Sequence, residues 1–357
     1  MAVAHRDGSF WVTSDLADVE FQVTSDLAVD KSSEGYTFEV LPLVRRDLRE
    51  NQIFDIWVHD GAKRRVGWFV PANAMSSDAH DFAENEHFLK YVYPAMHEVL
   101  KSHQEIFRNA LEDAILRGVS SASFADLFDT NLGFLVVCRE LLDVSGTFDT
   151  DRLIPSLVSY GWVPLEYCAP AAIEWTCSEF PSDNGSIVLN PVSGQVSSPD
   201  LAAMLFCVAA SANTSPVTQF FYLYQVVELL MEEVLHGLLP EIGNAVAASI
   251  ELKDYATVRD QLDGLNSTLS EKSRLRVLMK SIEGGDKAIQ ELASASDAFL
   301  SSVGMSHKAG IDGLYQVRNF IVHQVRNMRP EVAEQLDIVT RELAIFLAFV
   351  LGAYRRV

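Results

Sequence analysis

Hydrophobic residues alternate loosely with polar residues over the first 75 residues, and this pattern predicts short β-strands. Three runs are rich in β-branched and aromatic side chains, namely Tyr36–Val40, Ile53–Val58 and Val66–Val70, as half-buried strands usually are. The dipeptide Asp60-Gly61 stands between the second and third runs, where it favours a hairpin turn. We therefore expect residues 1–75 to form a β-rich N-terminal region.

The spacing of apolar residues changes to a helical period near residue 78. An amphipathic stripe consists of Phe88, Tyr91, Val92, Ala95, Val99 and Ile106. A second apolar run predicts a helix over Leu132–Leu142. Prolines and glycines interrupt residues 145–200, which indicates irregular structure with short strands such as Ser186–Leu189. We interpret residues 76–199 as a helical and irregular middle region that contains a domain junction.

The chain after Asp200 is predicted to be almost entirely helical. Apolar faces at helical spacing mark the segments Pro216–Leu238, Lys253–Leu262, Ser270–Ile282, Lys287–Leu300, Ile311–Met328 and Val332–Tyr354. Short loops between helices are typical of a bundle. The sequence thus predicts the α+β class, with a β-rich N-terminal region followed by helices and a C-terminal all-α bundle over residues 200–357.

Charge and cysteine content narrow the classes of function. The 357 residues include 49 Asp and Glu against 28 Lys and Arg, a formal net charge of -21 at pH 7. A protein this acidic does not bind nucleic acid through its bulk charge, so any such contact needs a local basic patch. The four cysteines form no C-x-x-C pair, and the longest apolar runs have about a dozen residues, where a membrane span needs about 20. We expect a soluble cytoplasmic protein with no membrane contact.

One C-terminal helix combines an apolar stripe with a polar face that has catalytic potential. The apolar stripe comprises Leu314, Val317, Ile321, Val325 and Met328, which fall within an arc of about 80° at 100° per residue. The opposite face carries Asn319, His323 and Arg326. Arg318 lies at the edge between the two faces, and Tyr315 borders the polar group one turn earlier. Asn319 and His323 are four residues apart, so their side chains can touch.

These side chains suit the chemistry of a phosphodiester. Histidine titrates near neutrality and can take or give a proton. Arginine binds phosphate oxygens with two parallel N–H groups and stabilises charge that develops in a transition state. Two basic runs stand out in the acidic chain. The first contains Lys308, Arg318, Arg326 and Arg329, and the second contains Lys272, Arg274, Arg276 and Lys280. A local positive strip of this kind is a candidate footprint for RNA.

The arrangement Arg318-Asn319-x-x-x-His323 resembles the R-x(4–6)-H motif of HEPN-domain ribonucleases. In that family the motif lies on a late helix of an α-helical bundle, often with Asn after the Arg. The expected first long helix also resembles that of the family, because an aromatic and an acidic residue follow each other as Tyr224-x-x-x-Glu228. The resemblance covers about residues 200–357 and does not extend to residues 1–199.

The resemblance implies a specific activity and assembly. HEPN ribonucleases cleave RNA without a metal or another cofactor, by attack of a ribose 2′-hydroxyl that leaves a 2′,3′-cyclic phosphate. By analogy His323 is the acid or base, Arg318 stabilises the phosphate, and Asn319 orients the His323 ring or the phosphate. Glu228 would then position the arginine, while Tyr315, Arg326 and Arg329 would support the site or contact RNA. The family also implies a homodimer through the motif helix or a larger assembly.

The same resemblance suggests a biological setting. Many HEPN proteins serve in prokaryotic antiviral defence or in toxin systems, with a separate N-terminal part that acts as a sensor. Residues 1–199 would then receive a protein or small-ligand trigger. The alternative is a non-catalytic HEPN-type module for dimerisation, interaction or regulation. The two differ in what Arg318 and His323 do, since a binding module should keep its partner when both are removed.

Other chemistries lack support in the sequence. The histidines His80, His87, His97 and His103 lie among several acidic residues. None has the H-x-x-x-H spacing that places two metal ligands on one helix face, so we interpret them as surface positions and expect no metal site. The chain also lacks a phosphate-binding G-x-x-x-x-G-K-[ST] loop, a G-x-G-x-x-G turn and a G-x-S-x-G elbow.

Overall fold

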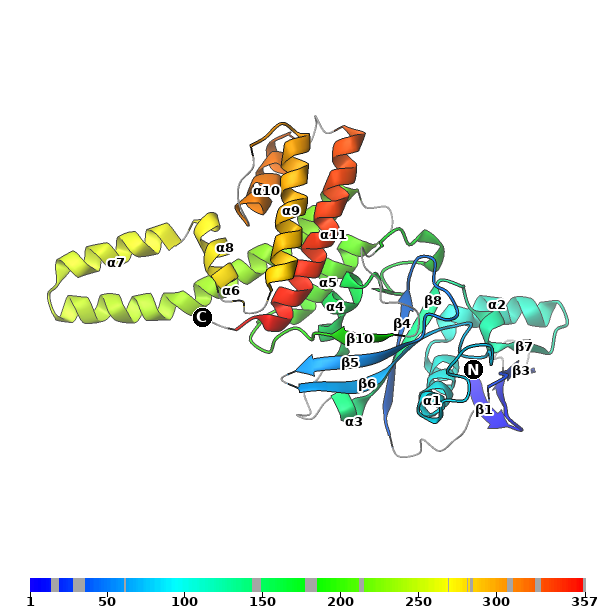
Figure 1. Ribbon diagram of the computed structural model, residues 1–357. Helices are drawn as coiled ribbons and strands as arrows, with labels where there is room; N and C mark the ends of the chain where they lie inside the picture. Colours follow the sequence, from blue (N-terminus) through cyan, green and yellow to red (C-terminus); the bar gives the residue numbers. More distant parts are fainter. Residues whose placement is uncertain are drawn as a thin grey trace. The chain divides into compact units, whose positions relative to one another are not determined.

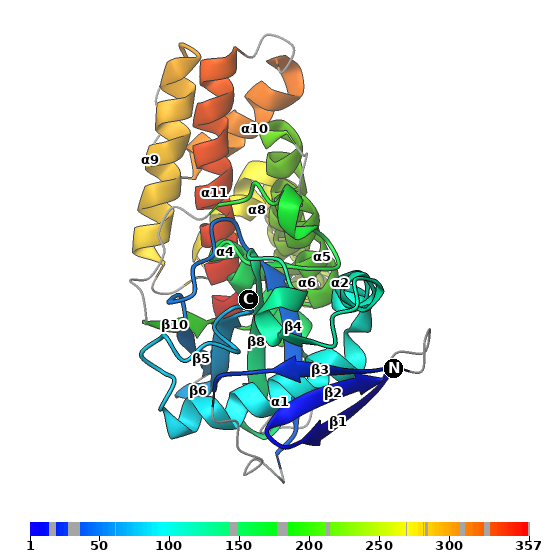
Figure 2. The same cartoon turned by 90° about the vertical axis from the view of Figure 1, so that its right-hand side faces the viewer.

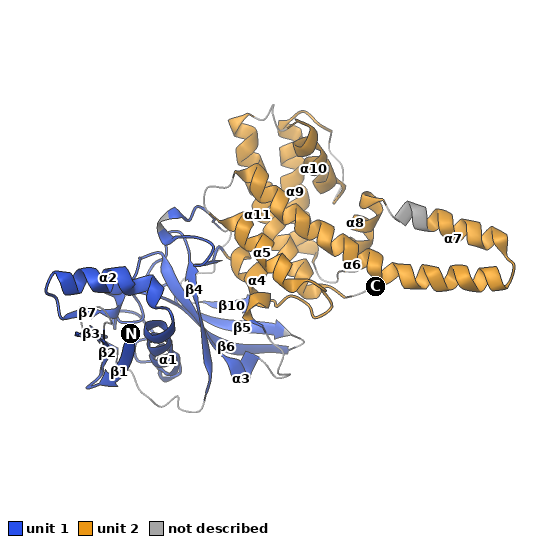
Figure 3. Ribbon diagram, turned by 180° about the vertical axis from the view of Figure 1, so that it is seen from behind, with its two compact units in different colours: residues 1–149, 161–189 blue, residues 150–160, 190–357 orange. Residues whose placement is uncertain are grey.

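The computed structural model places the chain in two compact units (Figures 1 and 3). Unit 1 contains residues 1–149 and 161–189, and unit 2 contains residues 150–160 and 190–357. The residues that the structure describes are 1–13, 19–27, 36–60, 62–142, 149–176, 185–211, 215–268, 270–280, 282, 285–306, 311–324 and 329–355. Strands dominate the N-terminal half and helices the C-terminal half, which confirms the predicted α+β class.

Unit 1 is built on two sheets. The larger has the strand order β10-β5-β6-β8-β4-β9, and the smaller has the order β1-β2-β3-β7. The strands of the larger sheet are β4 (Phe38–Val44), β5 (Phe54–Asp60), β6 (Ala62–Pro71), β8 (Leu132–Cys138), β9 (Val163–Pro164) and β10 (Ser186–Leu189). Those of the smaller are β1 (Ala2–Arg6), β2 (Ser9–Thr13), β3 (Glu20–Thr24) and β7 (Ser121–Ser123). The strands predicted in the first 75 residues, and the one at 186–189, are thereby confirmed.

The helix predicted over Leu132–Leu142 is wrong for most of its length. Residues Leu132–Cys138 form the strand β8, which pairs with β6 on one side and β4 on the other. All seven residues are buried, because a strand in the middle of a covered sheet has both faces in the core. A continuous apolar run of this kind is compatible with either a buried strand or a buried helix. Only Arg139–Leu142 is helical, as the short helix α3.

Helix α1 (Glu86–Ser102) covers one part of the large sheet in unit 1. It begins after Asn85, whose side-chain oxygen accepts hydrogen bonds from the backbone N–H groups of His87 and Phe88. Such a cap satisfies donors that have no partner within the helix. The predicted apolar stripe of α1 is buried against β4, β6 and β8. The stripe was expected to continue to Ile106, but that residue lies on the next helix, α2 (Gln104–Leu116).

Unit 2 is a helical region in which the last helix is central. Its helices are α4 (Ile154–Ser159), α5 (Pro199–Ala210), α6 (Pro216–Glu251), α7 (Tyr255–Thr268), α8 (Glu271–Lys280), α9 (Asp286–Ser302), α10 (Asp312–Gln324) and α11 (Pro330–Ala353). Helix α11 packs against α9, α6 and α4, and the pair α9 and α11 runs side by side in Figures 1 and 2. The segments predicted as helices after Asp200 are helical where the structure describes them. Most of their ends shift by a few residues, but α6 continues to Glu251, 13 residues beyond its predicted end at Leu238.

A buried carboxylate ties the start of α5 to α6. Glu233 is 3% exposed, and its Oε1 atom accepts a hydrogen bond of 2.8 Å from the backbone N–H of Ser197. The Ser197 hydroxyl donates to the same oxygen. Burial of a carboxylate is tolerated where such donors replace water. Glu233 therefore fixes the chain that enters α5 onto the middle of α6.

We expect Glu233→Ala to lower the free energy of unfolding of unit 2 by about 2–4 kcal/mol, because the Ser197 N–H loses its acceptor and a cavity opens. Urea unfolding followed by circular dichroism at 222 nm measures this loss. Glu233→Gln is the matched control, since it keeps an oxygen acceptor and should lose less than half as much. Equal losses for the two variants would contradict the role assigned to the hydrogen bonds.

Helix α6 continues beyond the packed part of unit 2 and forms an arm with α7. We define the arm as residues 236–264, which run from the second half of α6 through most of α7. In Figures 1 and 3 the two helices lie antiparallel and project from the other helices of the unit. Buried residues are frequent along α6 up to Val234, and within the arm only Ser249 is buried. The spacing of apolar residues predicted that α6 would end near Leu238, so the arm was not predicted.

Among the described residues, no helix is both long enough and apolar enough to cross a lipid bilayer.

Candidate functional site

Helix α10 carries the residues that the sequence analysis selected. Its buried face consists of Gly313, Leu314, Val317, Phe320 and Ile321, so the predicted apolar stripe is confirmed at three of its five positions. The other two, at 325 and 328, lie outside the described residues. Packing of this stripe against α9 fixes which side chains of α10 face outward.

Arg318 lies in a polar cluster that joins α6, α8 and α10. Its Nη2 atom is 3.9 Å from Oε1 of Glu228, and its Nε atom is 3.8 Å from Oε1 of Glu271. Its Nη1 donates a hydrogen bond of 3.2 Å to Oδ1 of Asn319. The guanidinium carbon also lies 5.8 Å from the centre of the Tyr224 ring, within the range of a cation–π contact. The side chain remains 27% exposed, so a ligand can reach it.

Tyr224 is the buried member of this cluster. The residue is 2% exposed, and its hydroxyl donates a hydrogen bond of 2.8 Å to Oε1 of Glu271. Burial first, and then the hydrogen bond to Glu271 and the charge of that carboxylate, raise the pKa of Tyr224, while Arg318 opposes them. Tyr224 is therefore a permanent donor that holds Glu271 beside the arginine.

The remaining predicted residues that the structure describes lie at other positions on α10 and at the start of α11. His323 is exposed on the last turn of α10, and Tyr315 is half-buried near its beginning. His323 follows Arg318 by five positions on the helix, which turns the two side chains about 140° apart. Arg329 is exposed at the N-terminal end of α11. Arg326 lies outside the described residues.

Three cations of the second basic run form ion pairs with acidic partners. Lys272 and Arg276 bind Oδ2 of Asp312 at 3.0 and 2.8 Å, and Arg274 binds Oε1 of Glu232 at 2.5 Å. Burial raises the pKa of Asp312, but its hydrogen bonds to Lys272 and Arg276 outweigh this effect and lower it. The sequence showed four cations against one acid over this run, whereas the fold brings further acids from α6 and α10. These three side chains therefore do not form a free positive strip.

The structure thus brings together Arg318, Asn319 and Glu228 from the predicted site and adds Glu271. Glu271 directly precedes the second basic run in sequence and was not among the predicted site residues. Its contact with Arg318 arises because α8 packs on α6, which places two carboxylates around one guanidinium. Such a set can hold the arginine in place and leave its exposed edge for an anion such as phosphate.

The described residues contain no group of three or more His, Cys, Asp or Glu side chains that could hold a metal ion. The interpretation of His80 as a surface position is wrong, because the residue is 9% exposed and its Nε2 atom lies 3.0 Å from the carbonyl oxygen of Ala74. Its Nδ1 accepts a hydrogen bond from the backbone of Phe82. These bonds explain the burial, since His80 closes the turn before α1.

Comparison with protein-family models, curated proteins and solved structures gives no match. The resemblance to HEPN ribonucleases therefore depends on the residues of α6 and α10 alone.

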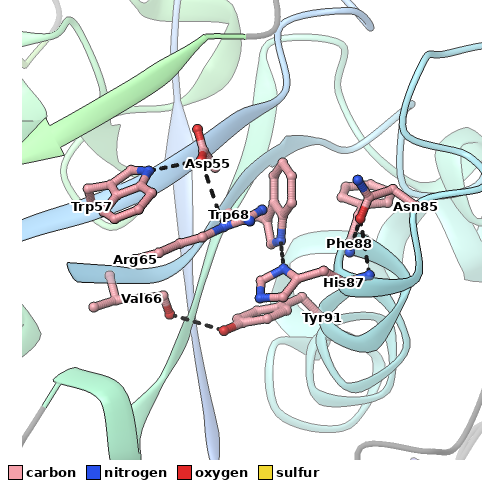
Figure 4. A network of polar contacts seen from close by, with 9 residues as sticks. All are labelled: Asp55, Trp57, Arg65, Val66, Trp68, Asn85, His87, Phe88 and Tyr91. Carbon is pink, nitrogen blue, oxygen red and sulfur yellow. Dashed lines mark hydrogen bonds and ion pairs between the residues drawn. The ribbon is translucent and has the colours of Figure 1, made fainter.

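A second polar network lies in unit 1, between β5, β6 and α1 (Figure 4). Asp55 accepts a hydrogen bond of 2.8 Å from the indole of Trp57 and lies 3.8 Å from Nε of Arg65. The Arg65 guanidinium carbon is 4.3 Å from the centre of the Trp68 ring. The Trp68 indole N–H in turn donates a hydrogen bond of 3.1 Å to Nδ1 of His87. The network fastens the beginning of α1 to two strands of the sheet.

His87 makes this network sensitive to pH. Burial first, and then the charges of Arg65 and Lys90, lower the pKa of His87, while Asp55 opposes them. The folded state therefore prefers the neutral imidazole, whose Nδ1 can accept from Trp68. Between the lowered pKa and about 6.5, the value of an unperturbed histidine, the unfolded chain binds more protons than the folded chain.

We expect the free energy of unfolding of unit 1 to be highest above about pH 6.5 and to fall as the pH decreases through the folded pKa of His87. Urea unfolding followed by tryptophan fluorescence between pH 5 and 8 measures this dependence. His87→Gln should flatten it, whereas His59→Gln, at an exposed position on β5, should leave it unchanged. A dependence that persists in His87→Gln would assign it to another group.

Proposed function

We propose that the helical unit 2 is a metal-independent endoribonuclease of HEPN type that acts in a prokaryotic antiviral defence or toxin system. The observation that carries the proposal is the position of Arg318. Its guanidinium is held by Glu228, Glu271 and Asn319, yet its side chain is 27% exposed. A fixed and accessible guanidinium suits a phosphate group whose negative charge grows during reaction.

The proposed reaction is a transfer within the RNA backbone. The ribose 2′-oxygen forms a bond to the adjacent phosphorus, and its proton passes to a general base. The bond between phosphorus and the 5′-oxygen breaks, and the departing 5′-oxygen takes a proton from a general acid. The products are a 2′,3′-cyclic phosphate and a 5′-hydroxyl. His323 supplies the proton transfer at neutral pH, and Arg318 stabilises the charge on the phosphate oxygens.

A single chain turns Arg318 and His323 to different faces of α10. The proposal therefore requires two copies that pair through α10, so that the histidine of one copy serves the phosphate held by the arginine of the other. Both residues lie off the buried stripe of α10, which leaves them free to meet a second chain. Residues 1–199 would receive the trigger that controls this activity.

The test is an RNA cleavage assay with the full chain in excess EDTA, followed by analysis of the product ends. Cyclic-phosphate ends that form in EDTA and disappear in His323→Ala support the proposal. Cleavage that stops on addition of EDTA, or products with 3′-hydroxyl ends, would contradict it. If the isolated protein does not cleave RNA, the assay is repeated with cell extract from phage-infected bacteria as a source of the trigger.

The neutralised basic run favours a second candidate, in which unit 2 is a non-catalytic interaction module. Ion pairs to Asp312 and Glu232 leave Lys272, Arg274 and Arg276 less able to attract RNA. In that case the double variant Arg318→Gln and His323→Ala should still capture the protein's partner from extract, and the wild type should leave RNA intact with and without infected extract.

A further inference from the structure

The arm formed by α6 and α7 has only one internal seam. Half-buried side chains along it include Ile242 and Val246 of α6 and Val258 of α7. Two antiparallel helices bury one stripe each against the other, and helices of this length are marginal in water without further packing. The arm therefore exposes more apolar surface than its seam can cover.

Large apolar side chains are concentrated on the outside of the arm. The exposed fractions are 41% for Leu239, 52% for Ile250, 69% for Tyr255 and 49% for Leu262. On α7, Tyr255 and Leu262 are seven residues apart and share one face. On α6, Leu239 and Ile250 likewise share one face. Exposed apolar side chains that share a helix face are candidates for an interaction site.

One face of α6 within the arm has a distinctive order of residue sizes. Leu239, Gly243, Ala247 and Ile250 fall within an arc of about 80°, and the centre of this arc is turned about 80° from the seam with α7. A Cβ atom added at Gly243 would meet nothing within 4 Å. Glycine inside a helix costs about 1 kcal/mol relative to alanine, and no contact within the chain requires it here. Close approach of another helix does require a small residue.

The order large, small, small, large reads the same in both directions along the helix. When two copies of this face meet antiparallel, Leu239 of one copy lies against Ile250 of the other, and Gly243 lies against Ala247. This is the self-complementary contact that a two-fold axis demands. A different protein would have to supply the same pattern, whereas a second copy of this chain already carries it.

Charge at the edges of the face agrees with this arrangement. His236 and Glu251 are both exposed. On the helical wheel His236 falls inside the arc of the apolar face, and Glu251 lies about 40° beyond the edge of the arc on the same side. In the antiparallel register His236 of one copy falls within one turn of Glu251 of the other, at both ends of the contact. An imidazole N–H can donate to the carboxylate there, and no like charges face each other across the axis.

We propose that two copies of this chain associate through their arms, with residues 239–250 of α6 antiparallel across a two-fold axis, so that the two helical hairpins form a four-helix bundle. Such bundles are a stable arrangement of two helical hairpins. This contact goes beyond the proposed ribonuclease site, because α10 takes no part in it.

The first test is the mass of the full chain in solution, measured by light scattering after size exclusion at about 1–50 μM. The wild type should be at least dimeric, since pairing through α10 would add to the arm contact. Ile250→Asp should raise the dissociation constant of the arm contact at least about 100-fold, because a carboxylate would be buried. Leu116→Asp is the control, since Leu116 is 84% exposed on α2 and outside the arm. A monomeric wild type, or an Ile250→Asp variant with native circular dichroism whose mass is the same as that of the wild type at every concentration, would overturn the proposal.

The second test reads the register and does not depend on weakening the fold. A chain with Gly243→Cys is mixed with a chain carrying Ala247→Cys and a size tag, and the mixture is oxidised. The proposal expects disulfide-linked heterodimers. Asn244→Cys in place of Gly243→Cys is the control, because it points about 100° away from the face. Equal cross-linking at 243 and 244, or none at 243, would overturn the register. RNA cleavage is scored separately, so failure of the ribonuclease proposal leaves both tests valid.

Discussion

Replacing His323 by alanine is expected to reduce RNA cleavage by at least about 100-fold. A positioned general acid or base contributes about 10²–10⁴ to the rate of such a reaction, and His323 is the proton-transfer group of the proposed site. Its exposed position on the last turn of α10 means that the substitution removes no core contact. The measurement is the rate of cyclic-phosphate formation by the full chain in EDTA, compared at equal concentration of folded protein.

The neighbouring residue provides a matched control for this loss. Gln324 is also exposed on the last turn of α10, so Gln324→Ala tests the effect of any surface change at this position. It should cleave RNA at close to the rate of the wild type. If both variants lose activity equally, or neither does, His323 is not the group that transfers the proton.

The second large effect is expected from Arg318→Gln, which should reduce cleavage by about 100- to 1,000-fold. Removing one group that stabilises developing charge typically costs this much. Glutamine keeps a polar side chain of similar reach but loses the positive charge. In the absence of that charge, the carboxylates of Glu228 and Glu271 would repel the phosphate. The loss should therefore affect both the binding of RNA and the rate of the chemical step.

Arg341 offers a control with a similar environment in the same unit. It is an arginine of α11, 31% exposed and paired with the carboxylate of Asp337. Arg341→Gln breaks an ion pair of the same kind without touching α10, and it should leave cleavage unchanged. A loss of activity in Arg341→Gln that equals that of Arg318→Gln would point to a general effect on unit 2.

The pattern of apolar and polar residues predicted those helices and strands that bury only one face. The apolar stripe of α10 could be read directly because its opposite face is polar, and the strand Ser186–Leu189 was recognised between turn residues. Strand β8 could not be recognised in this way, since burial on both faces removes the alternation that distinguishes a strand. The arm was missed for a different reason: apolar residues continue along α6 past Leu238, and sequence alone does not say where a helix leaves its core.

The candidate site shows the same limit at the level of side chains. Arg318 and Asn319 are neighbours in sequence, and Glu228 could be linked to them through a resemblance. Glu271 and the acids that neutralise the second basic run come from other helices. Their contacts depend on how α6, α8 and α10 pack, and counting charge along the chain cannot anticipate them.

The short helix α4 gives unit 2 an unusual order of assembly during synthesis. Ile154, Leu157 and Val158 are buried in the folded chain, and α4 packs against α11, which begins about 170 residues later. At 5–20 residues per second, the ribosome delivers α11 roughly 10–30 s after α4. Helix α5, which begins about 40 residues after α4, also packs against it, so α4 is partly covered during that interval and completes its packing only when α11 arrives.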